Sequence, residues 1–413
     1  MGKLAITGGT PVGPLKTAPW PPIDDDDRQA LLQVLESREW CRLHEHSAVG
    51  AFEESFACYH DAKRCIAVAN GTVAIELALL AAGVEAGDEV IVPAVTFVAT
   101  AGAVSMANAV PVFVDVDPET VQIDPAAVEA AITSRTKGIV AVHYGGYPVD
   151  FDRLLPIAKK HKLFLVEDCA HAQGSEWKGR KVSAIGTAGT FSFQMSKSLP
   201  SGEGGAVMTD DEALYQRALL LHNIGRGMGS RQYGHLVVAS NCRLSEFQGA
   251  LLSSQLRKLP AQVERKHEHG EWLAAELLKV GGLRPLKRDP RITRRGYYFF
   301  VMRYAKKAFG GLARDRFQDA MNAEGIDVFP AYGMPLYRNR AYRKEGRGNT
   351  GPVRVPSLNP GPDYDAMNLP VSERFCYEEQ LVLSHQWLLA DRSELQKIVD
   401  AVVKIKENVD ELA

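Results

Sequence analysis

Lys197 is the residue of this sequence that we single out first as a candidate for covalent chemistry. It lies between an apolar, strand-like run at residues 190–193 and a glycine-rich turn at residues 202–205. A lysine amine attacks a carbonyl group only in its neutral form, which near pH 7 requires burial or a neighbouring cation. Most lysines in loops are ordinary surface residues, so the case for Lys197 depends on what other parts of the chain would bring to it.

Two polar segments that follow strand-like runs would complement such a lysine. Asn70, Gly71 and Thr72 open a helical pattern, and the free N–H groups and hydroxyl of such a helix start suit a phosphate-sized anion. A threonine at this place is also an ordinary helix cap. Phe97 follows the next run and could offer its ring face to a flat heteroaromatic ligand, although burial in the core is an equal alternative.

Asp168 and His171 follow a further strand-like run. A carboxylate at a buried strand end is costly unless it is paired, and a protonated pyridine nitrogen would be a suitable partner for Asp168. His171 could hydrogen-bond a ring substituent or could be a structural histidine. A phosphate site, a ring face, a carboxylate and a lysine together describe the binding of pyridoxal 5'-phosphate (PLP) as a Schiff base with Lys197.

These residues stand at the ends of runs in a regular alternation of strand-like and helical patterns. Such an alternation predicts crossover connections and a mostly parallel sheet covered by helices on both faces. Ligands of these sheets bind beyond the carboxyl ends of the strands, where the candidate residues lie. The seven predicted strands cover residues 65–69, 89–92, 110–114, 138–142, 163–166, 190–193 and 206–208.

The length of the chain, 413 residues, predicts more than one hydrophobic core. We expect a Gly/Pro-rich N-terminal arm at residues 1–25, a large PLP-binding domain at 26–255 and a smaller α+β domain at 256–413. A helical pattern at residues 245–278 would join the two domains, and residues 346–362 form a long Gly/Pro-rich connection.

The composition of the chain argues against some classes of binding partner. The formal net charge of −2 provides no basic surface for nucleic acid or anionic membranes, and no apolar stretch reaches the ~18 residues of a membrane helix. Six cysteines without a C-x-x-C pair predict neither a metal site nor a disulfide framework. We therefore expect a cytoplasmic protein with small-molecule ligands or protein subunits as partners.

From about Trp20 to the C-terminal helix, the sequence resembles the DegT/DnrJ/EryC1/StrS family of sugar aminotransferases, within the fold-type I PLP enzymes. The resemblance implies a large domain with a seven-stranded, mostly parallel sheet and a smaller C-terminal domain. It rests on several specific motifs. They are Asn70-Gly71-Thr72, the GDEVIVP segment at 87–93, VDVD at 114–117, EDCAHA at 167–172, Phe191-Ser192-Phe193 through Lys197, SGEGG at 201–205 and SNCRLSEFQ at 240–248.

The resemblance also implies a role for each matching residue. Lys197, Asp168 and His171 would be the catalytic residues, acting on the cofactor aldehyde, the pyridine nitrogen and the ring hydroxyl; many members have glutamine where His171 stands. Asn241 would reach the cofactor phosphate of the neighbouring subunit, which implies a homodimer with shared sites. The remaining cofactor-binding positions are Gly71, Thr72 and Ser192 for the phosphate and Phe97 for ring stacking.

The function implied is transfer of an amino group from glutamate or glutamine to a keto-sugar or keto-cyclitol. A PLP-dependent dehydratase and an enzyme similar to aminohydroxybenzoate synthases are alternatives of the same family. Its dehydratase members carry histidine in place of the lysine, so Lys197 favours amino transfer. A non-catalytic regulator would need a basic face, which the composition does not provide. Residues that could line a polyol pocket, each with an equally good structural explanation, are His143, Tyr144, Arg226, Tyr332 and Tyr337.

Overall fold

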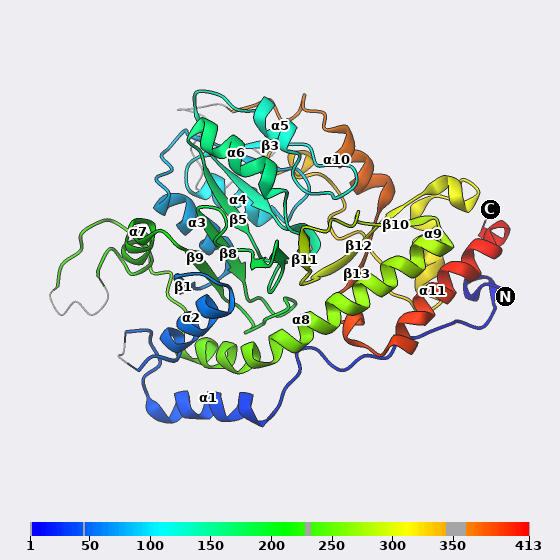
Figure 1. The fold of residues 1–413 in the computed structure, drawn as a ribbon, viewed down its shortest axis with the longest axis horizontal. Helices are drawn as coiled ribbons and strands as arrows, with labels where there is room; N and C mark the ends of the chain where they lie inside the picture. The colour runs from blue at the N-terminus through cyan, green and yellow to red at the C-terminus, as the bar shows by residue number, and fades with distance from the viewer. Residues whose placement is uncertain (1, 44–45, 228–232, 344–360, 413) are drawn as a thin grey trace.

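A seven-stranded sheet forms the centre of the computed structural model, which describes residues 2–43, 46–227, 233–343 and 361–412 (Figure 1). The strand order is β1-β9-β8-β5-β4-β2-β3. All neighbours from β8 to β3 are parallel, whereas β9 is antiparallel to both β8 and β1. The predicted mostly parallel α/β sheet is confirmed. Its strands are β1 Arg64–Val68, β2 Glu89–Pro93, β3 Val110–Val114, β4 Thr136–Val142, β5 Phe164–Asp168, β8 Ala188–Ser192 and β9 Gly205–Thr209.

Helices cover both faces of this sheet because successive strand residues point to opposite sides. In β2, Ile91 belongs to one hydrophobic cluster, whereas Val90 and Val92 belong to another. The Ile91 side is covered by α2 Ala48–Tyr59, α5 Pro125–Ala130, α6 Phe151–His161 and the first part of α8 Glu246–Val280. The opposite side is covered by α3 Gly71–Ala81, α4 Val98–Met106 and α7 Glu212–His222.

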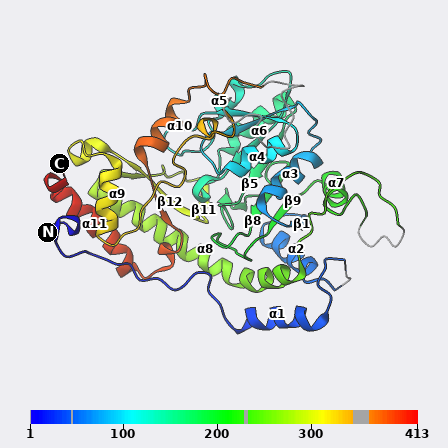
Figure 2. The same cartoon turned by 180° about the vertical axis from the view of Figure 1, so that it is seen from behind.

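A second hydrophobic core lies beyond the sheet. It is built on a three-stranded antiparallel sheet of order β10-β12-β13, and both chain termini lie at this end of the molecule (Figures 1 and 2). Leu4 and Leu15 of the N-terminal arm are buried in the same cluster. The elements here are β10 Leu283–Pro285, β12 Phe299–Tyr304, β13 Gln380–Ser384, α9 Arg314–Ala323 and α11 Arg392–Glu407. The remaining elements are α1 Asp25–Ser37, α10 Pro370–Arg374 and a small sheet of β11 Ile292–Arg294, β6 Glu176–Trp177 and β7 Arg180–Lys181.

Helix α8 contributes to both cores. Leu252 and Leu259 pack with the central sheet, whereas Leu273 and Leu277 pack with the C-terminal cluster. The predicted domain boundary between residues 255 and 256 falls inside this continuous helix, and the division into domains stays a prediction. Most of the predicted connection at 346–362 lies outside the described residues.

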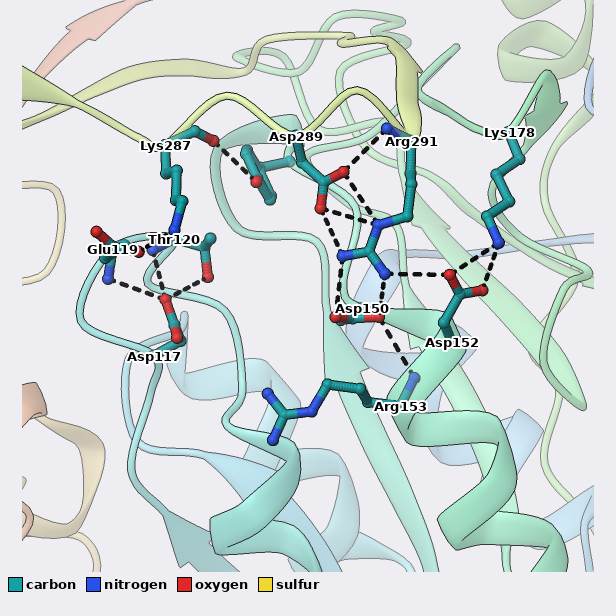
Figure 3. Close-up of polar contacts among 11 residues, drawn as sticks. Asp117, Glu119, Thr120, Asp150, Asp152, Arg153, Lys178, Lys287, Asp289 and Arg291 are labelled. Atoms are coloured by element: carbon teal, nitrogen blue, oxygen red, sulfur yellow. Dashed lines mark hydrogen bonds and ion pairs between the residues drawn. The ribbon is translucent and has the colours of Figure 1, made fainter.

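A charged network ties the segment before β11 to the start of α6 and to the loop around Glu119 (Figure 3). The Arg291 guanidinium contacts three carboxylates, those of Asp150 at 3.0 Å, Asp152 at 3.1 Å and Asp289 at 2.6 Å. Lys287 pairs with Glu119 at 2.5 Å. The start of α6 is thereby linked to a segment that lies more than a hundred residues further along the chain.

The structure bears on two expectations from composition, those about membrane helices and about the cysteines. Within the described ranges, no helix has the length and apolar character that crossing a membrane requires. The six cysteines are all free, and Cys65, Cys169 and Cys376 are buried. The cytoplasmic location stays a prediction.

Candidate active site

A cavity of about 850 Å³ opens where β4, β5 and β8 end and α3 begins. The carboxyl ends of parallel strands are the expected place for a ligand site in such a sheet. Asn241 is exposed and is not part of the cavity wall. The other seven predicted site residues all line the cavity: Gly71, Thr72, Phe97, Asp168, His171, Ser192 and Lys197.

The Lys197 side chain points into this cavity, where little stabilises the positive charge of its amine. Its Nζ lies 4.1 Å from the centroid of the Tyr298 ring. Burial lowers the pKa of Lys197 to about 8, and the attraction of Asp168 opposes that shift. A substantial fraction of the amine is therefore neutral near physiological pH, which is the form that attacks a carbonyl.

Asp168 presents a buried carboxylate at the end of β5, with 5% of the residue exposed. It accepts hydrogen bonds from Thr100 Oγ1 at 2.8 Å and from the Ala170 amide at 3.1 Å. Burial raises the pKa of Asp168, while these two hydrogen bonds and the nearby Lys197 act in the opposite direction. Both hydrogen-bond donors are neutral, so a cationic ligand group in the cavity would offset much of the cost of burying the charge.

His171 is buried and neutral. The Gly145 amide donates to Nδ1 at 3.4 Å, so Nε2 carries the ring proton and donates it to Tyr332 Oη at 3.2 Å. Burial lowers the pKa of His171 well below its usual range. The imidazole also stacks on Tyr298 with 4.3 Å between ring centroids. These contacts orient the ring, and Tyr332 Oη is left with a proton to donate.

The start of α3 provides a polar end to the cavity. The Asn70 side chain caps the helix by accepting the Val73 amide at 2.9 Å, and the amides of Gly71 and Thr72 have no carbonyl within the helix to bond. A Cβ atom added at Gly71 would lie 2.7 Å from Ser192 Cβ. Glycine therefore allows the helix start to approach the end of β8, which brings backbone amides and the Ser192 hydroxyl together.

Three further residues at the site were not predicted as site residues. Thr100 of α4 bonds the Asp168 carboxylate, and Tyr298, just before β12, lines the cavity. Neither carries a local signal, because each acquires its role from a contact with a distant segment. Tyr332 was one of five residues considered for a polyol pocket, and it lines the cavity. Two others of that set, His143 and Tyr337, are instead hydrogen-bonded to buried or half-buried glutamates.

This fold and this cavity define a class of protein, the enzymes in which a lysine amine reacts with carbonyl compounds. That conclusion rests on the buried Lys197 amine and the buried Asp168 carboxylate, which line the same cavity at the strand ends. The model of the DegT/DnrJ/EryC1/StrS aminotransferase family matches residues 21–385. The chain therefore belongs to this family and is an aminotransferase, as the sequence motifs predicted.

The sequences of similar proteins align with almost the whole chain. The L-glutamine:2-deoxy-scyllo-inosose aminotransferase of Streptoalloteichus tenebrarius is 40% identical over 429 residues, which cover 99% of each protein. The L-glutamine:scyllo-inosose aminotransferase of Streptomyces griseus is 37% identical and covers 100% of this chain and 99% of its own. The crystal structure of 3-amino-5-hydroxybenzoic acid synthase has a TM-score of 0.82 at 35% identity, over 95% of this chain and 98% of that one. The predicted fold-type I architecture is confirmed.

Proposed function

We propose that this aminotransferase uses PLP to move the amino group of L-glutamine to the ketone of a cyclitol. The observation that carries the proposal is the Lys197 amine of lowered pKa in one cavity with the buried Asp168. The substrate pair is supported by the names of two relatives, which share L-glutamine and differ in whether the inosose acceptor is deoxygenated. The acceptor is therefore proposed as a class, the keto-cyclitols.

The residues of the cavity fit PLP in three respects. Gly71, Thr72 and Ser192 form an anion site from helix amides and a hydroxyl, as a phosphate requires. Asp168 is a buried carboxylate whose hydrogen-bond donors are neutral, as a pyridinium partner requires. Phe97 lines the same cavity and offers an aromatic face. When bound, PLP would supply an aldehyde carbon and a protonated ring that accepts electrons from the bond to be broken.

Each of the three proposed catalytic residues would then have its own role in the reaction. Lys197 Nζ would hold the cofactor through its aldehyde carbon, and the neutral amine would take up and return the proton of the substrate carbon. The Asp168 carboxylate would pair with the pyridine nitrogen and favour its protonated form, an attraction that burial strengthens because few waters compete. With PLP bound, the ring hydroxyl would replace Tyr332 Oη as the acceptor of the His171 Nε2–H, and the neutral state of His171 avoids placing a second cation beside Lys197.

The test is a pair of half-reactions, each monitored through the visible absorption of the PLP-loaded protein. We expect L-glutamine to bleach the band, and 2-deoxy-scyllo-inosose or scyllo-inosose to restore it. Lys197→Ala should lose at least about 100-fold in turnover, since it removes the general base. Formation of the 2-oxo acid of glutamine separates amino transfer from a dehydratase or an aminohydroxybenzoate-synthase-like reaction. A band that no amino donor bleaches would contradict the proposal.

We further propose a homodimer in which Asn241 completes the site of the neighbouring subunit. Apolar side chains are exposed both at the cavity and near Asn241, which supports a buried contact between copies. Phe97 and Met106 of the cavity wall are 54% and 44% exposed. Leu236 and Val238, shortly before Asn241, are 77% and 102% exposed.

A further inference from the structure

A second lysine, Lys266 of α8, lies fully buried close to the lysine of the active site. Only 1% of Lys266 is exposed. Its Nζ donates to Ser198 Oγ at 2.8 Å and is 3.4 Å from the Tyr297 carbonyl oxygen, and both acceptors are neutral. Burial lowers the pKa of Lys266 to about 7. An amine buried among neutral groups costs free energy that an apolar side chain at this helix position would avoid.

Ser198 is the residue immediately after Lys197, so the Lys266 contact bears on the turn that carries the reactive amine. Three other distant segments also hold this turn, residues 194–198. Trp20 Nε1 donates to the Met195 carbonyl at 3.2 Å. His385 Nε2 donates to the Ser196 carbonyl at 3.0 Å, and the Ser196 and Tyr298 hydroxyls are 2.8 Å apart.

The contacts lie on both sides of Lys197 but leave its amine free. Ser196 is held before it by His385 and Tyr298, and Ser198 is held after it by Lys266. The two bonds to Ser196 come from Tyr298, just before β12, and from His385, just after β13. Lys266 comes instead from α8, the helix that contributes to both cores (Figures 1 and 2). The bond to Ser198 is therefore the one that joins the turn to α8.

We propose that Lys266 is a positioning residue for Lys197. By holding Ser198, it sets the direction in which the Lys197 side chain leaves the turn, and thus keeps the amine over Tyr298 and near Asp168. This inference rests on the proposed function of Lys197. A displacement of about 1 Å at a reacting group can cost about 100-fold in rate, so one well-placed hydrogen bond at the adjacent residue is sufficient to matter.

The test uses the PLP-loaded full chain carrying Lys266→Met, Ser198→Ala or both. We expect Lys266→Met to lower kcat by about 10- to 100-fold, with the KM for L-glutamine changed by less than about 2-fold. The pH midpoint of the visible absorption of bound PLP should also shift, because the surroundings of the Lys197 nitrogen change. Ser198→Ala should reproduce these effects, and the double variant should be no worse than the stronger single one, since both remove the same bond.

Lys404→Met is the matched control. Lys404 is also buried, but its Nζ bonds Glu324 at 2.9 Å and the Thr10 carbonyl at 2.7 Å, in the C-terminal core and away from the cavity. Its loss should lower the melting temperature while the absorption midpoint and KM stay unchanged. Lys266→Met must move the midpoint beyond this control.

The inference is overturned if Lys266→Met changes only the melting temperature, or if the losses of the two single variants multiply in the double variant. If Lys266→Met does not fold, Ser198→Ala decides, and wild-type kcat and absorption in that variant reject the inference. A wild-type protein without any visible PLP band would instead reject the proposed function. The two failures are therefore distinguishable.

Discussion

At the scale of single residues, Lys197 and Asp168 are two cavity residues of opposite charge that burial pushes toward neutrality. Burial lowers the pKa of the Lys197 amine and raises that of the Asp168 carboxyl, while the attraction between the two opposes both shifts. Each charge therefore stabilises the other in a setting that would otherwise neutralise them. The amine remains easy to deprotonate, as proton transfer at a substrate carbon requires.

The first prediction concerns the titration of Lys197 in the PLP-free protein. The rate of its acylation by an amine-reactive reagent, followed by peptide mass spectrometry, should rise with pH and reach half of its maximum at about pH 8. Asp168→Asn should move this midpoint to lower pH, because it removes the negative charge whose attraction raises the lysine pKa.

The control for this titration is the same peptide in urea-unfolded protein, where the midpoint should return toward the ordinary lysine value of 10.5. A midpoint that stays in place or rises in Asp168→Asn would show that the carboxylate does not act on the amine. Loss of labelling at every pH would mean that the reagent does not reach the cavity, and a smaller reagent would then be used.

At the scale of elements, the start of α3 depends on a close approach that only glycine permits. A Cβ atom at Gly71 would meet the Ser192 side chain, and one at Gly205 would come within 2.5 Å of the Asn70 carbonyl carbon. The start of α3, the end of β8 and the start of β9 are thus held in close contact. This contact forms the proposed phosphate site.

We therefore predict that Gly71→Ala weakens PLP binding more than it weakens the fold. The added methyl group must push α3 and β8 apart, at a cost of about 1–3 kcal/mol for an overpacked contact. If that cost falls on the binding geometry, the dissociation constant for PLP rises by about 5- to 150-fold. Absorbance titration of the PLP-free protein with PLP measures it, alongside thermal unfolding.

Gly102→Ala is the matched control, since Gly102 is also helical and a Cβ atom there meets nothing within 4 Å. Alanine at an open helix position should be neutral or stabilise by up to about 1 kcal/mol. PLP affinity equal in the two variants would refute a specific role for the close approach at Gly71.

The elements were more predictable from sequence than their contacts. The seven strands follow from local alternation of apolar runs and helical patterns, and Asp168 and Lys197 could be found because each lies within a few residues of the end of such a run. Tyr298 and Lys266 could not, because Tyr298 lies in an apolar run and Lys266 in a helical one. Their roles come from packing against a turn that lies about 70 to 100 residues earlier in the chain.

At the scale of the whole molecule, the Arg291 network joins the segment before β11 to the start of α6 (Figure 3). Arg291→Gln would leave Asp150, Asp152 and Asp289 close together without their shared cation. Because Arg291 is about one-third exposed, we expect a loss of only about 1 kcal/mol in unfolding free energy. Denaturation at low and high salt measures it, and the loss should shrink in 1 M NaCl, where repulsion between the aspartates is screened. An equal loss at both salt concentrations would point to lost packing on Trp177 instead.

The assembly of the molecule is tested through Asn241, which is exposed and outside the cavity of its own chain. If it serves the neighbouring site, Lys197→Ala and Asn241→Ala should each impair the homodimer for a different reason. Mixing the two variants after unfolding and refolding makes heterodimers by symmetry. In each heterodimer one site carries both substitutions, and the other combines an intact Lys197 with an intact Asn241.

Activity should therefore return on mixing, to about a quarter of the wild-type value when equal amounts pair at random, because half of the dimers are mixed and each has one intact site. If Asn241 acted within its own subunit, every site of the heterodimer would lack one residue and no activity would return. Mixing Lys197→Ala with Asp168→Asn provides the control, since both residues line the cavity of a single chain and cannot complement each other across a dimer. Recovery in the first mixture together with none in the second would require a site built from two subunits.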